Sequence, residues 1–195
     1  MVKSGIGLAA VAALALAGCG KPSGDTTANN ASAAEPPVNA SAGSGKTDTP
    51  ILTGLQNSGE HGTFANAVKA AGLTQTFSGA QPYTVFAPTD AAFQKLTAGT
   101  VDSLMAADAK GRLVSLITGH MVQGFVTAGD LGHAIDRGKG KAQLATIGGG
   151  TLTFTRSGDN IVVADTKCGQ GTITHADITQ SNGIVHSIDT VLGAK

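Results

Sequence analysis

The segment over residues 84–93 constrains the fold of this chain more than any other, because it passes from strand to helix within a few residues. It begins Thr-Val-Phe-Ala, and such β-branched and apolar residues are typical of a buried strand. Pro88 interrupts the strand, and Thr89 and Asp90 offer side-chain oxygens to the free N–H groups of a helix start. The segment therefore predicts a strand over residues 83–87 and a short helix that begins at Thr89 or Asp90.

A second segment, residues 181–192, predicts a hairpin turn followed by a long strand. Asn182 and Gly183 form a dipeptide typical of two-residue hairpin turns, and β-branched residues follow them. In a type I′ turn both residues would need a positive φ, which glycine accepts freely and asparagine tolerates. We therefore expect a structural role in the turn, rather than a binding role, for Asn182 and Gly183.

The order of helical and strand signals indicates an α+β fold. Apolar residues recur at helical spacing after Thr63, a candidate cap, and end at Gly72, a candidate helix C-terminal glycine. Asp108 is a candidate cap for a longer helix with His120 on its apolar face, and residues 127–130 fit a capping box. Strands are expected over residues 142–147, 151–155, 161–164, 172–174 and 183–192. Helices early and strands late favour this class over a βαβ repeat.

The first 18 residues have the features of a lipoprotein signal peptide. Lys3 precedes an apolar run over residues 5–16 that is too short to span a bilayer as a mature helix. The run ends in Leu-Ala-Gly before Cys19, which resembles the lipobox of bacterial lipoproteins and implies cleavage before Cys19 and acylation of its thiol. An ordinary secretory signal peptide that contains a cysteine is the alternative. Gly20 is not an acidic retention residue, which favours an outer-membrane location.

Residues 19–48 are expected to form the lipidated cysteine and a disordered tether. The stretch consists mainly of Ala, Ser, Gly, Asn, Thr and Pro, so it cannot bury enough apolar area to offset its ordering entropy. A flexible chain of about 30 residues has a reach on the order of 30 Å. The tether would hold a single folded domain, residues 49–195, away from the lipid headgroups.

The charge of the folded part argues against nucleic acid as a partner. From Ile51 onward seven Lys and three Arg are balanced by nine Asp and one Glu, and no basic cluster occurs. We therefore expect the membrane contact to come from the acyl anchor and not from anionic lipid. The chain has no Trp, and Tyr83 is its one Tyr, so aromatic platforms for stacking sugars or bases are scarce.

Together the two segments resemble the hallmark motifs of the fasciclin (FAS1) domain family. The resemblance extends over residues 49–192, and residues 119–124, Gly-His-Met-Val-Gln-Gly, are similar to the family's intermediate histidine motif. Gly119 stands where that motif usually has Tyr, and Gln123 stands where Pro is common, so the adhesive Tyr–His pair of animal members is incomplete here. The resemblance implies a FAS1 fold, a wedge-like β-sandwich of short strands with helices clustered in the N-terminal half. Within the family, the chain resembles single-domain bacterial members, which include mycobacterial secreted and lipoprotein antigens.

The resemblance also implies which residues bind and which support the fold. Contacts are expected near the first motif and around residues 119–124, and the candidate interaction residues are His120, Gln123 and Phe125. For His120 the residues themselves favour a core position over an interaction role, because it lies on an apolar helix face. The residues expected to support the fold are Asp90, Asn182, Gly183 and His186.

No motif for catalysis, metal binding or a cofactor occurs in the sequence. The five histidines lack the spacing of metal-binding motifs, and no Gly-x-Ser-x-Gly elbow is present. The glycine runs at 148–150 and 169–171 lack the Lys-Ser/Thr of a phosphate loop. Cys168 lies in a glycine-flanked loop. It is either an exposed thiol that can react or an incidental small residue. We therefore expect a protein that is not an enzyme.

Two functions fit these features. The first is a membrane-anchored, extracytoplasmic adhesion or interaction module of the bacterial cell envelope, which binds a protein or polysaccharide without turnover. The second is a periplasmic lipoprotein that holds a small apolar ligand between its helices and sheet. The second requires an enclosed apolar cavity of at least about 300 Å³, whereas the first requires exposed loops or strands.

Overall fold

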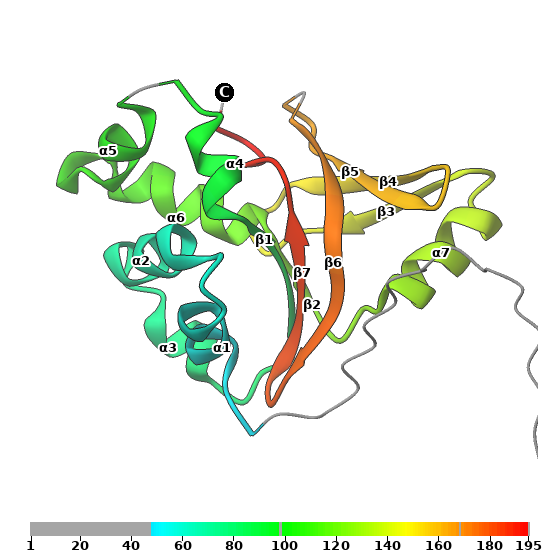
Figure 1. The fold of residues 1–195 in the computed structure, drawn as a ribbon, viewed down its shortest axis with the longest axis horizontal. Coiled ribbons are helices and arrows are strands. Elements are labelled where there is room, and N and C mark those ends of the chain that lie inside the picture. Colours follow the sequence, from blue (N-terminus) through cyan, green and yellow to red (C-terminus); the bar gives the residue numbers. More distant parts are fainter. Residues whose placement is uncertain (1–47, 98, 168, 195) are drawn as a thin grey trace, which may run out of the picture. The chain divides into compact units, whose positions relative to one another are not determined.

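The computed structural model describes residues 48–97, 99–167 and 169–194. In this part of the chain, seven strands form one mixed sheet in the order β2-β1-β7-β6-β5-β4-β3 (Figure 1). The strands are β1 (Tyr83–Pro88), β2 (Met121–Gln123), β3 (Lys141–Ala145), β4 (Thr151–Ser157), β5 (Asn160–Ala164), β6 (Gln170–Gln180) and β7 (Gly183–Ile188). The helices are α1 (Ile51–Asn57), α2 (Gly62–Ala71), α3 (Thr74–Ser78), α4 (Asp90–Gln94), α5 (Thr100–Met105), α6 (Lys110–Gly119) and α7 (Ala128–Arg137), with a 3₁₀ turn, η1 (Ala107–Ala109).

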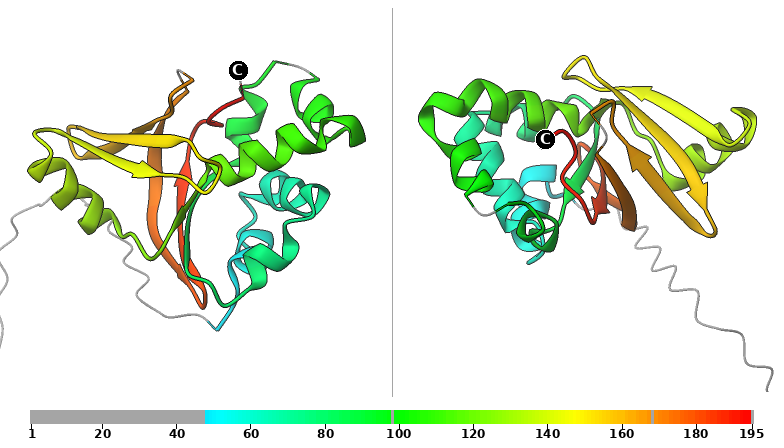
Figure 2. Two further views of the ribbon diagram at one scale, coloured as in Figure 1. Left: turned by 180° about the vertical axis from the view of Figure 1, so that it is seen from behind. Right: turned by 90° about the horizontal axis from the view of Figure 1, so that it is seen from above.

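Strand β6 joins two halves of the sheet that diverge. Strand β1 pairs parallel with β7 and antiparallel with β2, whereas β3, β4 and β5 form an antiparallel meander. The first residues of β6 pair with β5 and its later residues pair with β7, with register shifts and a positive φ of 59° at Asp177. The halves open like a wedge (Figure 2). An isolated bridge between Val122 and Thr146 links the outer strands, so the sheet is barrel-like.

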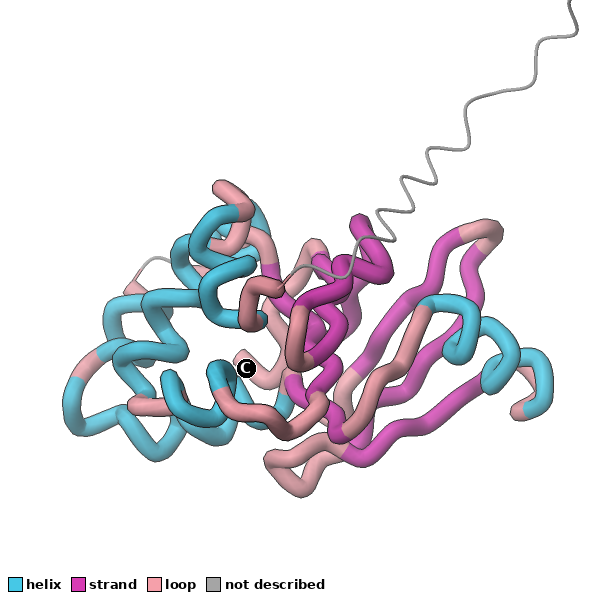
Figure 3. Tube along the Cα trace, turned by 90° about the horizontal axis from the view of Figure 1, so that it is seen from below, coloured by secondary structure: helices cyan, strands magenta, loops and turns pink. Residues whose placement is uncertain are grey.

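The sheet separates two hydrophobic cores, because successive strand side chains point to opposite faces. Val85 and Ala87 of β1 belong to the helix-side core, under the early helices. Phe86, between them, belongs to the sheet-side core, where its ring lies 5.0 Å from that of Phe154. Helix α7 covers this second core and contributes Leu131 to it. Figure 3 shows the other helices gathered beyond the opposite face of the sheet.

Several local predictions are confirmed by the backbone. Strand β1 passes directly into α4, and the Thr89 hydroxyl caps that helix by accepting from the Ala92 N–H at 3.3 Å. Helix α2 ends at Gly72, whose φ of 79° is the left-handed conformation expected of a C-terminal glycine. Thr127 begins α7 with the predicted capping box: its hydroxyl accepts from the Asp130 N–H, and the Asp130 carboxylate accepts from the Thr127 N–H, both at 3.0 Å.

Two predicted helix caps are wrong. Helix α2 begins at Gly62 without a side-chain cap, and Thr63 is already inside it. The Thr63 N–H instead donates to Asp90 Oδ1 at 2.8 Å, so a side chain distant in sequence satisfies this helix start. Asp108 lies in η1, and α6 begins two residues later at Lys110 without a side-chain cap.

The predicted hairpin turn is shifted by one residue. Gln180 pairs with Gly183, so the two-residue turn is Ser181–Asn182, and neither Asn182 nor Gly183 has a positive φ. The type I′ prediction is therefore wrong. A different constraint selects Gly183: a Cβ there would lie 2.0 Å from the backbone oxygen of Tyr83. Strand β6 is also much longer than predicted, because its polar residues and bulges hide its alternation, and β7 ends before residue 192.

Candidate interaction surface

The loop after β2 presents Phe125 to solvent between two anchored residues. Gly124 turns the chain with a φ of 95°. The buried Thr84 hydroxyl of β1 donates to the Gly124 carbonyl at 2.8 Å and accepts from the Val126 N–H at 2.9 Å. Phe125 lies between these two contacts and is 55% exposed. The backbone of the loop is therefore fixed by the sheet, while the aromatic side chain remains accessible to solvent.

His186 fixes the same loop from β7. Its Nε2–H donates to the Val126 carbonyl at 2.8 Å, and its Nδ1 accepts from the Asp177 N–H at 3.2 Å. The ring stacks on Phe86 with centroids 5.3 Å apart and has no exposed area. Burial lowers the pKa of His186, so the ring is neutral at physiological pH. Its bonds are all internal, and they position the loop.

His120 is buried and cannot contact a partner directly, so the expectation of an interaction role there needs correction. Its Nδ1–H donates to the Leu116 carbonyl at 2.8 Å, and its Nε2 accepts from the Leu192 N–H at 3.0 Å. Burial lowers the pKa of His120 to about 4. The ring thus ties the end of α6 to the C-terminal segment, and both nitrogens are occupied.

Asn182 makes three hydrogen bonds in the interior. Its Oδ1 accepts from the Ile51 N–H at 2.9 Å, and its Nδ2 donates to the carbonyls of Phe77 and Gly79 at 2.9 and 2.8 Å. One side chain in the β6–β7 turn therefore holds the start of α1 and the end of α3. We infer a structural role for Asn182, as for Asp90, whose carboxylate holds the start of α2.

The exposed candidates lie at the two ends of β2. Gln123 is exposed, and Phe125 follows it in the chain. Ile147, which is 42% exposed, donates its N–H to the Met121 carbonyl at 2.9 Å at the other end of the strand. Phe125 and Ile147 are the two exposed large apolar side chains among the described residues. We call Gln123, Phe125 and Ile147 the β2 surface. Sequence reasoning missed Ile147 as a surface candidate, because it placed this residue at the end of the strand predicted over residues 142–147, whereas β3 ends at Ala145.

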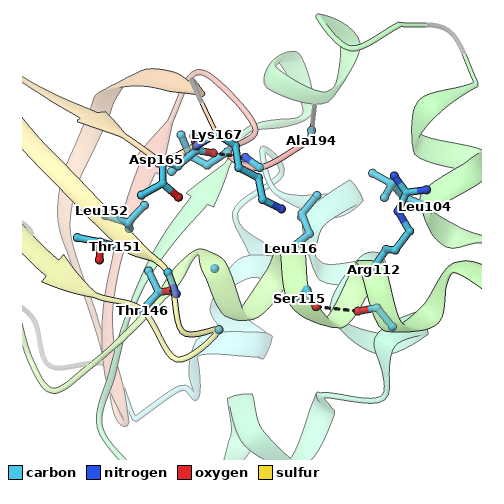
Figure 4. Close-up of a pocket in the computed structure, with 17 residues that line it drawn as sticks. Leu104, Arg112, Ser115, Leu116, Thr146, Thr151, Leu152, Asp165, Lys167 and Ala194 are labelled. Carbon is cyan, nitrogen blue, oxygen red and sulfur yellow. Dashed lines mark hydrogen bonds between the residues drawn. The ribbon is translucent and has the colours of Figure 1, made fainter.

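A cavity of about 380 Å³ lies along α6 (Figure 4). It is bounded by α6, the β3–β4 turn, the β5–β6 loop and the C-terminal segment. Its lining includes leucines, glycines, hydroxyl groups and the charged residues Arg112, Asp165 and Lys167. No sequence pattern indicates this cavity, because its walls come from five separate segments, with Leu104 of α5 as the fifth.

Other kinds of site find no support in the described part of the chain. No group of three or more His, Cys, Asp or Glu side chains is arranged to hold a metal ion within residues 48–97, 99–167 and 169–194. None of the helices that the structure describes has the length and apolar character needed to cross a bilayer. Cys19, the signal peptide and almost all of the expected tether lie outside the described residues, as does Cys168.

These features define an α+β domain, in which a wedge-shaped mixed sheet backed by helices carries exposed side chains on short, anchored loops. The family model of the fasciclin domain matches residues 59–194. The chain therefore belongs to the fasciclin domain family, as the sequence motifs predicted.

Similar proteins come from bacteria and animals. The chain is 38% identical over 130 residues to protein sll1483 of Synechocystis sp., and this match covers 67% of the chain and 65% of that protein. It is 31% identical over 167 residues to immunogenic protein MPB70 of Mycobacterium bovis, with 82% and 77% covered. It is 33% identical over 167 residues to cell surface glycolipoprotein MPB83 of the same species, with 82% and 67% covered.

A solved structure shows the same fold. A FAS1 domain pair from the insect cell adhesion molecule fasciclin I superposes with a TM-score of 0.65 at 20% sequence identity. The match covers 74% of this chain and 51% of that chain, as expected when one domain is compared with two. The predicted α+β FAS1 fold is confirmed, and the named relatives include surface and adhesion proteins.

Proposed function

We propose that this protein is a lipid-anchored module of the bacterial cell envelope that binds an extracytoplasmic protein or polysaccharide without turnover. The observation that carries the proposal is the fixed presentation of Phe125, whose loop is held by Thr84 and His186 while its side chain is 55% exposed. A side chain on an anchored backbone loses less conformational entropy on binding than one on a mobile loop, and aromatic residues are enriched at interfaces. The names of the relatives, a cell surface glycolipoprotein and an adhesion molecule, support this function.

The anchor in this proposal is Cys19, which follows Leu-Ala-Gly at the end of a short apolar run. Two or more acyl chains hold a protein stably on a membrane, since each buried CH₂ contributes about 0.8 kcal/mol. The variant Cys19→Ser should abolish labelling by a palmitate analogue and block processing at this position. Labelling that persists, or that moves to Cys168, would show that the anchoring part of the proposal is wrong.

The alternative function, carriage of a small apolar ligand, requires an apolar cavity, but the cavity of this protein is lined by both apolar and charged side chains. The cavity volume of about 380 Å³ is sufficient, but Arg112 and Lys167 line it together with leucines. A wholly apolar ligand would leave these charged groups without polar partners where it covered them, which is unfavourable. The geometry therefore favours the interaction module, and the cavity suits a ligand of different chemistry.

The interaction proposal is tested by adhesion or biofilm formation of whole cells that carry Gln123→Ala with Phe125→Ser. We expect loss of adhesion at normal surface abundance, measured by immunoblot. The matched control is Gln143→Ala, which removes an exposed glutamine on β3 that is not part of the β2 surface. Normal adhesion by the β2 variant, or equal loss in the control, would contradict the proposed contact site.

A further inference from the structure

The cavity beside α6 has an apolar wall and a charged rim. Leu116, Leu152 and Leu192 are buried side chains that line it, and they come from α6, β4 and the C-terminal segment. A volume of about 380 Å³ lies within the range of small-molecule sites. The wall can therefore cover the apolar part of a small ligand, while its polar part meets the charged residues of the rim.

Two cations on the rim are available to a ligand. Arg112 lies in the first turn of α6, and Lys167 lies in the β5–β6 loop across the cavity. Figure 4 shows the Lys167 side chain reaching over the cavity toward Leu116, and the Arg112 side chain rising from α6 on the other side. Neither cation forms an ion pair with another residue in the part of the chain that the structure describes.

The one carboxylate of the lining is already used by the backbone. Asp165 Oδ1 accepts from the N–H groups of Lys167 and Gly169 at 2.8 and 2.7 Å, and its Oδ2 accepts from the Gly193 N–H. These bonds fix the β5–β6 loop against the C-terminal segment and so position Lys167. With two cations and one anion, the charged lining has a formal charge of +1, which one negative charge would neutralise.

Two glycines keep the helix side of the cavity open. Gly111 and Gly119 of α6 both line it, and a Cβ added to either would meet nothing within 4 Å. Neither has a positive φ, so the backbone does not require glycine at these positions. A second hollow of about 260 Å³ shares Leu104, Arg112 and Ala194 with the cavity, which places Arg112 where the two adjoin.

We propose that this cavity binds a small organic monoanion, a carboxylate with a short apolar chain. The guanidinium of Arg112 matches a carboxylate in a two-bond geometry, Lys167 supplies a second charge, and the leucines cover the chain. A phosphate monoester, with up to two negative charges, would exceed the single positive charge of the lining. The site goes beyond the proposed function, because it takes a small molecule and none of the three β2-surface residues lines it, although Thr146 and Gly148 flank Ile147.

The test is calorimetric titration of octanoate into the full-length protein. Variants are prepared identically, so that partition of the probe elsewhere cancels between them. We expect a Kd below roughly 1 mM for the unchanged protein. Arg112→Gln should weaken binding by about tenfold or more, because it removes a charge-assisted contact. Gly119→Tyr, which restores the residue usual in the family motif, should fill the cavity and abolish binding while leaving the fold intact by circular dichroism.

Two sets of controls show whether the carboxylate of the probe and the position of the cation both matter. Arg137→Gln, which removes an exposed cation on α7, should bind octanoate as the unchanged protein does. The neutral probe 1-octanol and inorganic phosphate should each bind at least tenfold more weakly than octanoate. Absence of octanoate binding, equal binding by Arg112→Gln or Gly119→Tyr, or equal binding of 1-octanol or phosphate would overturn the proposal. Adhesion by the β2 surface is measured separately, so either proposal can fail without the other.

Discussion

The centre of the sheet and its rim use their residues in opposite ways. Of the buried residues, Asn182 in the β6–β7 turn and His186 in β7 direct every polar side-chain atom to the protein's own backbone. On the rim, Phe125 and Lys167 are exposed, while neighbouring residues fix their backbone. The most recognisable motif residues of this chain therefore support the fold; we call the folded sheet and helices that they support the platform. The side chains that are free to meet a partner belong to the loops that the platform holds.

The largest effect is expected at Gly183, where the centre is most crowded. Gly183→Ala would place a Cβ 2.0 Å from the Tyr83 backbone oxygen and 2.6 Å from Ile51 Cδ1. Because backbone cannot yield as a flexible side chain does, we expect a loss of at least about 3 kcal/mol in the free energy of unfolding, measured by urea melts. Gly111→Ala, where a Cβ meets open space, is the matched control and should gain about 0.5–1 kcal/mol. Equal midpoints for the two variants would refute the close approach.

The buried histidines should make the centre sensitive to acid. The pKa of His120 is about 4 in the folded protein, below the ordinary value of about 6.5 in the unfolded chain. The unfolded state therefore binds a proton below about pH 6.5, whereas the folded state binds it only near pH 4. Stability present above about pH 6.5 is lost as the pH falls through this window, by about 3 kcal/mol for His120 alone.

The measurement is the slope of the unfolding free energy against pH, taken from urea melts between about pH 6 and pH 5. His120→Gln, which has no titratable side chain, should reduce this slope by about 1.4 kcal/mol per pH unit relative to the unchanged protein. The slope isolates the proton from any loss of packing in the variant. Equal slopes for His120→Gln and the unchanged protein would mean that His120 is already protonated in the folded protein over this pH range.

A smaller effect is expected where sequence and structure disagree about helix caps. Thr127→Ala removes the hydroxyl that begins α7 and should cost about 1 kcal/mol, the usual value for a capping threonine. Thr63→Ala should cost less than about 0.5 kcal/mol, because α2 has no side-chain cap. Denaturant midpoints of the two variants provide the measurement. A larger loss of stability for Thr63→Ala than for Thr127→Ala would support the helix cap at Thr63 that the sequence predicted.

Features that depend on residues close together in the chain could be predicted from the sequence, whereas features that depend on contacts between distant residues could not. The β1–α4 passage and the capping box at Thr127 rest on neighbours a few residues apart, and they were predicted correctly. The reason for Gly183 rests on Tyr83, which is distant in the chain but paired with it in the sheet. No local pattern contains that contact.

The candidate site was predicted only in part, for the same reason. Phe125 and Gln123 were found from the motif, and the structure places both on the surface. The hydrogen bond that satisfies the buried Nε2 of His120 comes from the Leu192 N–H, which the fold brings to it from the C-terminal segment. Ile147 and the lining of the cavity come from separate segments as well, and their proximity exists only after the wedge has formed.

The most direct test of the separation between platform and contact residues compares Phe125→Ser with Thr127→Ala, which lie close together in the chain. Unfolding free energy and whole-cell adhesion are measured for both, with surface abundance controlled. Phe125→Ser should leave stability within about 0.5 kcal/mol and remove adhesion, because its exposed ring packs little against the protein. Thr127→Ala should lose about 1 kcal/mol of stability and keep adhesion. The reverse pattern, with adhesion lost at Thr127 and kept at Phe125, would contradict this separation.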